Sequence, residues 1–373
     1  MKKSILLLSV LAMGASLYAQ EEGRVGINTD SPKATLDISR KEGLPASQVQ
    51  GAILPHISMD ERNQFKNVTE GTMIYNTTKH CIDWFDGTNW QCMASEPKMP
   101  SQTCEKLVKD RCYGKTTKEC VGYGAEEREH DFIYCEITGP DGRKWLNFNL
   151  GAEYAREGSP DFNPTKPLTE IWKDDYKAYG SLFQWQRNPD GHELINWTSS
   201  TLKGEEIPPF KYTPNLDMID YPKSWTNAGT NKFIRVDEQQ LSWLDNKAFE
   251  QSSEFNLWQS GGATNPCPEG YHVPTKEELM KLRNAIEKSN LDEKQIVSFK
   301  MFEERSLALP FSGFMFTPTW GSAGEEGHLW SSEIKLEKYS NSPWNLDYNR
   351  YTSEILASSG DYYGFGVRCI KDL

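Results

Sequence analysis

The sequence predicts a mainly β or α+β fold, and three observations support that class. Residues 20–95 contain short runs in which apolar and polar residues alternate, separated by turn signals such as Asp30-Ser31-Pro32. Residues 137–373 are rich in Trp, Tyr, Gly and Pro, hold ten of the twelve Trp residues, and show few long helical patterns. The one clear helical pattern covers residues 276–289, so strands and loops dominate the prediction.

The first residues predict a secretory signal peptide. Lys2 and Lys3 form a basic start, the apolar run after them is too short to span a bilayer, and Ala19 is a small residue suited to a cleavage site. We therefore expect residues 1–19 to be removed and the mature chain to be secreted. Its expected location is the outer cell surface or the periplasm of a Gram-negative bacterium. No later stretch is apolar for long enough to predict a membrane span.

The acidic composition excludes some classes of partner. The chain has 53 Asp and Glu against 41 Lys and Arg, a formal net charge of -12. Nucleic acids and anionic membrane surfaces bind proteins through a positively charged footprint. We therefore expect neither nucleic acid nor a membrane surface as a partner.

Residues 20–95 predict a small β-rich module. Val25 and Ile27, and then Leu36 and Ile38, repeat with a period of two. The stretches VGINTDSPKATLDIS, GAILPHISMDERNQF and EGTMIYNTTKHCIDWFDGTNW resemble the N-terminal module of many exported Bacteroidetes proteins, which is similar to phage tail-fibre stalks. The resemblance implies a stalk that is often trimeric, so a homotrimer through this module is expected. A small monomeric β-domain is the alternative.

A hairpin in this module predicts one disulfide. Asp86-Gly87 favours a type I′ turn, because that turn needs positive φ at both central residues. If these residues form the turn, positions whose numbers sum to 173 face one another. Cys81 and Cys92 are such a pair, and directly opposed strand residues lie within disulfide distance. We therefore predict a Cys81–Cys92 disulfide.

Residues 96–136 predict a Cys-rich connecting segment. It has little apolar core of its own and would depend on crosslinks. All eight Cys follow the signal peptide, and an even number in an oxidising compartment predicts up to four disulfides. The spacings do not fit a zinc ribbon. Pairing within the segment stays open among Cys104, Cys112, Cys120 and Cys135.

The predicted helix at residues 276–289 is amphipathic. Thr275 followed by Glu278 forms a capping box. Charged residues, Arg283 among them, are expected on the solvent side. The apolar stripe consists of Leu279, Leu282 and Ile286.

Residues 137–373 carry six ordered motifs: GRKWLNFNLGA, YGSLFQW, NPCPEGYHVPTKEEL, LALPFSGF, GHLWSSE and YYGFGVRCIKD. Together they resemble the Fibrobacter succinogenes major paralogous (FISUMP) domain, which is similar to the C-type-lectin-like fold. The resemblance implies short antiparallel strands beside one or two helices, with the chain ends close together. It also implies a Cys267–Cys369 disulfide. His272, left without a free thiolate beside it, is then expected to be packed or half-exposed rather than a ligand.

Catalysis has little support in the sequence. It contains no GxSxG elbow, HExxH helix, Walker loop or GxGxxG turn. Formylglycine-generating enzymes share the broad fold but use two cysteines near the C-terminus, where this chain has only Cys369 after Cys267. Carboxylates are numerous, so a glycosidase pair stays open. Glu325 and Glu326 beside His328 are the nearest candidates, although their Gly neighbours favour an exposed turn.

The candidate ligand-binding residues lie in the predicted loop region. Aromatic side chains with a polar edge suit both sugar rings and protein partners. Asn345 and Asp347 loosely resemble a motif of calcium-dependent lectins and are a secondary calcium candidate; otherwise we expect no metal and no cofactor. The candidates are Trp320, Trp344, Asn345, Asp347, Tyr348 and Tyr351.

Three functions follow from these observations. The leading hypothesis is an exported, non-catalytic, adhesin-like surface protein that binds a glycan or a protein partner. The alternative is a structural component of a surface fibre without a soluble ligand. The third is a polysaccharide hydrolase that uses an unrecognised carboxylate pair.

Overall fold

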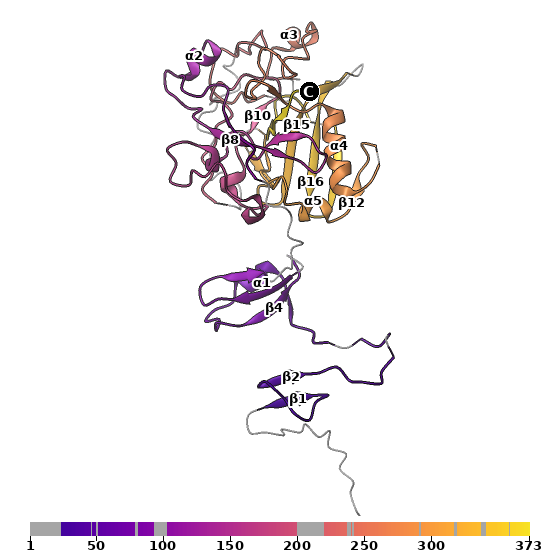
Figure 1. The fold of residues 1–373 in the computed structure, drawn as a ribbon. Coiled ribbons are helices and arrows are strands. Elements are labelled where there is room, and N and C mark those ends of the chain that lie inside the picture. Colours follow the sequence, from indigo (N-terminus) through magenta and orange to yellow (C-terminus); the bar gives the residue numbers. More distant parts are fainter. Residues whose placement is uncertain are drawn as a thin grey trace, which may run out of the picture. The chain divides into compact units, whose positions relative to one another are not determined.

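The computed structural model describes residues 24–45, 47–49, 51–78, 81–92, 103–199, 220–236, 240, 242–290, 292–316, 319–336, 341–357 and 359–373. The chain divides into two compact units, residues 1–97 and 98–373 (Figure 1). The expected signal peptide, residues 1–19, lies outside the described residues. Within the described part of the chain, no helix is long and apolar enough to cross a membrane. The structure confirms the mainly β fold class.

The first unit contains two small sheets. In one, the short strands β1 (Val25–Ile27) and β2 (Leu36–Ile38) pair in parallel. The second has the order β3-β4-β5-β6, in which β3 and β4 are parallel and the other pairs antiparallel. Helix α1 (Met59–Asn63) starts at a capping box made by Ser58 and Glu61. The strands of the second sheet are β3 (His56–Ile57), β4 (Met73–Asn76), β5 (Cys81–Phe85) and β6 (Trp90–Cys92).

A buried ion pair joins α1 to the four-stranded sheet. Arg62 of α1 donates to the carboxylate of Asp83 in β5 at 2.6 Å, and the Asp83 side chain is fully buried. Asn76 of β4 donates to the same carboxylate oxygen at 2.6 Å. A buried carboxylate is stable only when such partners replace its water. The polar contact therefore fixes the helix on a sheet that has few buried apolar residues.

The Cys81–Cys92 disulfide is present, but the predicted hairpin register is wrong. Cys92 lies opposite Asp83 rather than Cys81, so facing positions sum to 175. The turn is longer than expected because the Asp86 N–H donates to the carbonyl of Asn89, which leaves Gly87 at the turn with φ of 93°. The two cysteines are diagonal neighbours, with their Cα atoms 5.9 Å apart.

The second unit contains three sheets and several short helices. The sheet orders are β11-β19-β9-β8-β7, β10-β18-β13-β14 and β12-β17-β16-β15. The strands are β7 (Lys106–Lys109), β8 (Ile133–Thr138), β9 (Lys144–Leu146), β10 (Phe183–Gln184), β11 (Tyr271–His272), β12 (Ile296–Val297), β13 (Phe314–Phe316), β14 (Thr319–Gly321), β15 (Glu326–Leu336), β16 (Asn341–Asn349), β17 (Thr352–Leu356), β18 (Gly364–Phe365) and β19 (Ile370–Lys371). The helices are α2 (Thr117–Val121), α3 (Asn246–Glu250), α4 (Lys276–Glu287) and α5 (Lys300–Glu303), with 3-10 turns η1 (Glu153–Ala155), η2 (Leu168–Glu170) and η3 (Tyr176–Ala178).

The described part of the Cys-rich segment, residues 103–136, is an integral part of this unit and not a separate connector. Its strands β7 and β8 form the outer part of the five-stranded sheet. Phe132 and Tyr134 belong to the main hydrophobic core. The open pairing resolves as Cys104–Cys135 and Cys112–Cys120. The segment thus has a core, which it shares with residues far away in the sequence.

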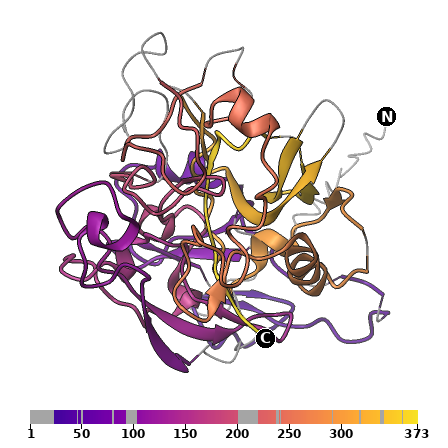
Figure 2. The same cartoon turned by 90° about the horizontal axis from the view of Figure 1, so that it is seen from above.

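Helix α4 confirms the predicted capping box and apolar stripe. Thr275 accepts from the Glu278 N–H, and Leu279, Leu282 and Ile286 are buried. Figure 1 and Figure 2 show the helix beside the β15–β17 sheet, which it contacts. The expected solvent position of Arg283 is wrong, because its guanidinium is buried and donates to main-chain carbonyls of residues 292–294.

The core of the second unit is built on tryptophan. Each of six fully buried indoles donates its N–H to an acceptor, which removes the cost of burying a polar group. Arg187 and Arg368, which lie in or next to the motifs that carry the FISUMP resemblance, are also buried and donate to several carbonyls. The buried tryptophans are Trp145, Trp185, Trp225, Trp243, Trp258 and Trp330.

The two ends of this unit meet in the five-stranded sheet. Trp145 of β9 lies opposite Ile370 of β19, so strands near the start and the end of the unit are neighbours. A disulfide joins Cys369, just before β19, to Cys267, as the resemblance implied. This arrangement agrees with the expectation that the chain ends lie close together.

Candidate functional site

The six candidate ligand residues do not form one surface. Tyr348 is buried and donates its hydroxyl to the Pro310 carbonyl at 2.8 Å. Asn345 is only 1 % exposed. These two side chains lie three positions apart on β16 and so point to opposite faces of the strand, and both are part of the interior. The backbone of Trp320 belongs to β14, but its side chain lies outside the described residues.

Two of the aromatic candidates reach the surface. Tyr351 is 56 % exposed and lies edge-on against Phe299. Trp344 is half-buried, and the Lys276 ammonium lies 3.7 Å from the centre of its ring. A cation over an indole face is a favourable contact that already occupies that face. Among the candidates whose side chains the structure describes, Tyr351 thus keeps the most accessible aromatic surface.

The calcium candidate is a hydrogen-bonded charge cluster. One oxygen of Asp347 lies 2.5 Å from Nδ1 of His328 and 2.5 Å from the side-chain amide of Asn345. Burial alone would lower the pKa of His328, but Asp347 and Glu326 outweigh burial and raise that pKa to about 9. At neutral pH an imidazolium therefore supplies the positive charge beside Asp347. Glu325 is exposed in the turn that was expected, whereas Glu326 begins strand β15 and is half-buried.

His272 has carboxylate partners on both sides. Its Nδ1 lies 2.6 Å from Asp372 and its Nε2 lies 2.9 Å from Glu278 of the capping box. Burial opposes protonation, but these two hydrogen bonds raise the pKa of His272. The expectation of a packed residue holds. The residue ties the start of α4 to the C-terminal end of the chain.

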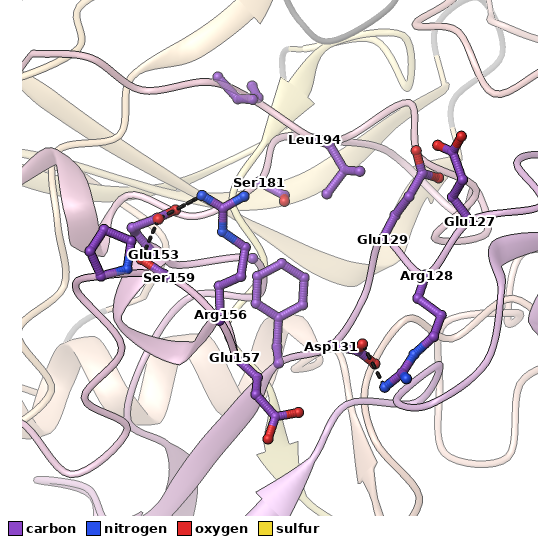
Figure 3. A pocket seen from close by; sticks show the side chains of 15 residues that line it. Glu127, Arg128, Glu129, Asp131, Glu153, Arg156, Glu157, Ser159, Ser181 and Leu194 are labelled. Carbon is purple, nitrogen blue, oxygen red and sulfur yellow. Dashed lines mark hydrogen bonds and ion pairs between the residues drawn. The ribbon is translucent and has the colours of Figure 1, made fainter.

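The cavity that stands out in the second unit lies elsewhere, and the sequence did not reveal it. It has a volume of about 550 Å³ and lies between η1 and the segments 127–132 and 194–195. Figure 3 shows two ion pairs on opposite sides of this cavity. The lining residues are Glu127, Arg128, Glu129, Asp131, Phe132, Gly151, Glu153, Arg156, Glu157, Gly158, Ser159, Pro160, Ser181, Leu194 and Ile195. We call this cavity the acidic pocket.

Both arginines of the acidic pocket are paired with carboxylates of the same pocket. Arg128 lies 2.7 Å from Asp131, and Arg156 lies 2.6 Å from Glu153. Glu157 accepts from the Tyr113 hydroxyl at 2.6 Å. With five carboxylates against two guanidinium groups, the lining carries a net negative charge. Such a lining suits ligands that donate hydrogen bonds, such as hydroxyl-rich sugars or amines.

A glycine shapes the wall of the acidic pocket. Gly151 has φ of 80°, and a Cβ at this position would lie 2.0 Å from the Ser181 hydroxyl oxygen. Only glycine adopts this conformation without strain and leaves this space. The Gly151 N–H donates to the buried Tyr134 hydroxyl, which connects the wall to the core.

A buried network of charged side chains is formed by residues that are close in the sequence to those that line the acidic pocket. His130 contacts Glu193 at 2.6 Å, and His192 contacts Asp190 at 2.8 Å. Burial disfavours the charge on His130, but Glu193 outweighs it and raises the pKa of His130 to about 9. Asp190, His192 and Glu193 are close enough to share a metal ion. Arg187 already lies 2.8 Å from Asp190, so the group is balanced by its own cations.

The missed residues carry no recognisable sequence signal. The acidic pocket takes Glu153 and Arg156 from η1 and its end, Glu127 to Asp131 from the approach to β8, and Ser181 from a loop. These segments are far apart in the sequence and share no motif. The buried network, by contrast, has a local signal in the DGHE run at residues 190–193, where Asp190 and Glu193 both contact His192.

Comparison with known protein families matches residues 26–106 to a phage tail like trimerisation region. This match supports the predicted tail-fibre-like stalk module in the first unit. The assignment of residues 137–373 to the FISUMP family receives no support from the comparison. No curated protein and no solved structure matches the chain.

Proposed function

We propose that this chain is an exported, non-catalytic fibre protein whose stalk forms a homotrimer and whose second unit binds a glycan or a protein partner. The observation that carries the proposal is the match of residues 26–106 to a trimerisation region. The chain places a larger, disulfide-bonded unit after that region. A trimeric stalk would present three copies of this unit, and multivalent binding raises avidity without new contacts.

Two features of the second unit support a binding role. The acidic pocket offers carboxylate acceptors next to apolar side chains, a combination that suits the hydroxyls and the ring faces of a sugar. Tyr351 offers an exposed aromatic face. The FISUMP motifs in the sequence favour the same role through their resemblance to lectin-like domains. Calcium at Asn345 and Asp347 remains a secondary proposal.

The test is binding of the oxidised mature chain to a glycan and matrix-protein array, with calcium and again with EDTA. We expect retention of at least one ligand class, with equal retention in EDTA if the acidic pocket is the site. Glu127→Gln changes a pocket carboxylate, and Glu126→Gln changes its exposed neighbour outside the lining as the matched control.

Each result of the array has a distinct meaning. Weaker binding of Glu127→Gln alone would support the acidic pocket. A signal lost in EDTA would favour the calcium candidate instead. Absence of binding to every ligand on the array would refute the binding role and favour the purely structural fibre component. Turnover of a polysaccharide, abolished by one Asp or Glu substitution, would contradict the non-catalytic proposal.

A further inference from the structure

The parallel β1–β2 pair exposes an apolar face. Val25 lies opposite Leu36, and Ile27 lies opposite Ile38. Because side chains at alternate positions of a strand point to the same side, all four lie on one face of the pair. Their exposed fractions are 40 % for Val25, 57 % for Leu36, 42 % for Ile27 and 45 % for Ile38.

The opposite face is covered by the connection between the two strands. A Cβ on Gly26 would lie 2.5 Å from the carbonyl oxygen of Thr29, so the backbone of the connection passes directly over this face. Asp37 accepts from the Lys33 N–H at 2.9 Å and from the Ser39 hydroxyl at 3.0 Å. The polar face is thus satisfied within the segment, whereas the aliphatic face is not covered by it.

Such a pair needs further burial to be stable. Each strand has three residues, and an isolated pair of strands is marginal in water. Parallel strands are almost always buried on both faces. The trimerisation match includes Ile27, Leu36 and Ile38, which is an independent reason to expect other copies of the chain here.

We propose that the face formed by Val25, Ile27, Leu36 and Ile38 is the contact through which three copies of this chain associate. The inference rests on the proposed trimeric stalk and names the surface that holds it together. In a closed assembly with three-fold symmetry each copy contributes the same patch. Three identical aliphatic faces can meet around the axis and remove these side chains from water.

The test compares the oligomeric mass of the full, oxidised chain with that of two variants over a range of concentrations. Ile27→Asp/Ile38→Asp places two carboxylates per copy on the face. Val297→Asp is the matched control, because Val297 is 79 % exposed and belongs to β12 of the second unit. We expect a trimer for the unaltered chain and the control. The double variant should need at least about 100-fold higher concentration to associate.

A second measurement does not depend on the double variant folding. A photo-reactive amino acid at Ile38 should yield covalent dimers and trimers on a denaturing gel, and the same group at Val297 should yield none. A trimeric chain with no intermolecular crosslink from Ile38 and an unchanged double variant would overturn this assignment while the trimeric stalk stands. A chain that is monomeric at all concentrations would overturn both.

Discussion

Removal of the Cys267–Cys369 disulfide should destabilise the second unit more than removal of the short crosslink. These cysteines are 102 residues apart, whereas Cys112 and Cys120 are 8 residues apart. In the chain-entropy model a crosslink restricts the unfolded chain, and the effect grows with the logarithm of the loop length. The model gives roughly 4.7 kcal/mol for the long loop and roughly 2.5 kcal/mol for the short one.

The experiment is chemical denaturation of Cys267→Ala/Cys369→Ala and of its control Cys112→Ala/Cys120→Ala. Buried tryptophans report unfolding of the second unit by fluorescence. We expect both variants to lose free energy of unfolding, and the long-loop variant to lose about 2 kcal/mol more. The two variants are comparable because neither substitution removes a large apolar side chain from the core.

The loop closed by the Cys267–Cys369 disulfide determines which result would refute the loop-entropy argument. Cys267 and Cys369 close a loop that contains α4 and the three strands β15, β16 and β17. If the short-loop variant lost as much stability as the long-loop variant, loop entropy would not explain the role of this crosslink. Local packing around each cysteine would then have to carry the difference.

Three further predictions concern charges and backbone shape. The folded pKa of His328, about 9, exceeds the ordinary value of 6.5, so its contribution to the free energy of unfolding is full below pH 6.5 and is lost as the pH rises to 9. The pH dependence of this free energy, measured by denaturation, should therefore flatten in His328→Gln. An unchanged slope would contradict the ion pair with Asp347. Asp83→Ala leaves Arg62 buried without its partner and should lower the free energy of unfolding of the first unit by about 3–5 kcal/mol. Circular dichroism of the full chain would detect this loss as an earlier unfolding transition, and a loss below about 1 kcal/mol would argue against the buried pair. Gly151→Ala forces a strained φ and a clash with Ser181, so the thermal midpoint of the second unit should fall. The control is Gly158→Ala, which should have the smaller effect because Gly158 has φ of 86° but open space around it.

Local patterns in the sequence predicted local structure well. The capping box at Thr275 and the apolar stripe of α4 depend on residues within one helix, so spacing alone was enough. Arg283 was placed wrongly because the carbonyls it meets belong to residues 292–294, beyond the helix. The pattern of a helix shows which residues are charged but not which of them a later loop will cover.

The stalk hairpin shows how a correct pairing can follow from a wrong register. The Asp86-Gly87 signal gave facing positions that sum to 173, whereas the strands pair at 175. Cys81 and Cys92 still meet because diagonal neighbours across a strand pair also lie within disulfide distance. The distance condition is therefore less strict than the register argument assumed.

The candidate site was the least predictable part. Tyr348 and Asn345 looked like surface residues because loop-rich segments usually expose their aromatic and polar side chains. In the structure they belong to the long strand β16, which is covered by other elements. The acidic pocket escaped notice because Glu153, Arg156 and Ser181 meet only through tertiary packing.

Sedimentation equilibrium of the unaltered, oxidised chain, from low to high protein concentration, would give the number of copies per particle and so test the trimeric stalk. We expect three copies per particle, associated through the region at residues 26–106. A mass of one chain at every concentration would contradict the trimeric stalk and the fibre-like role built on it.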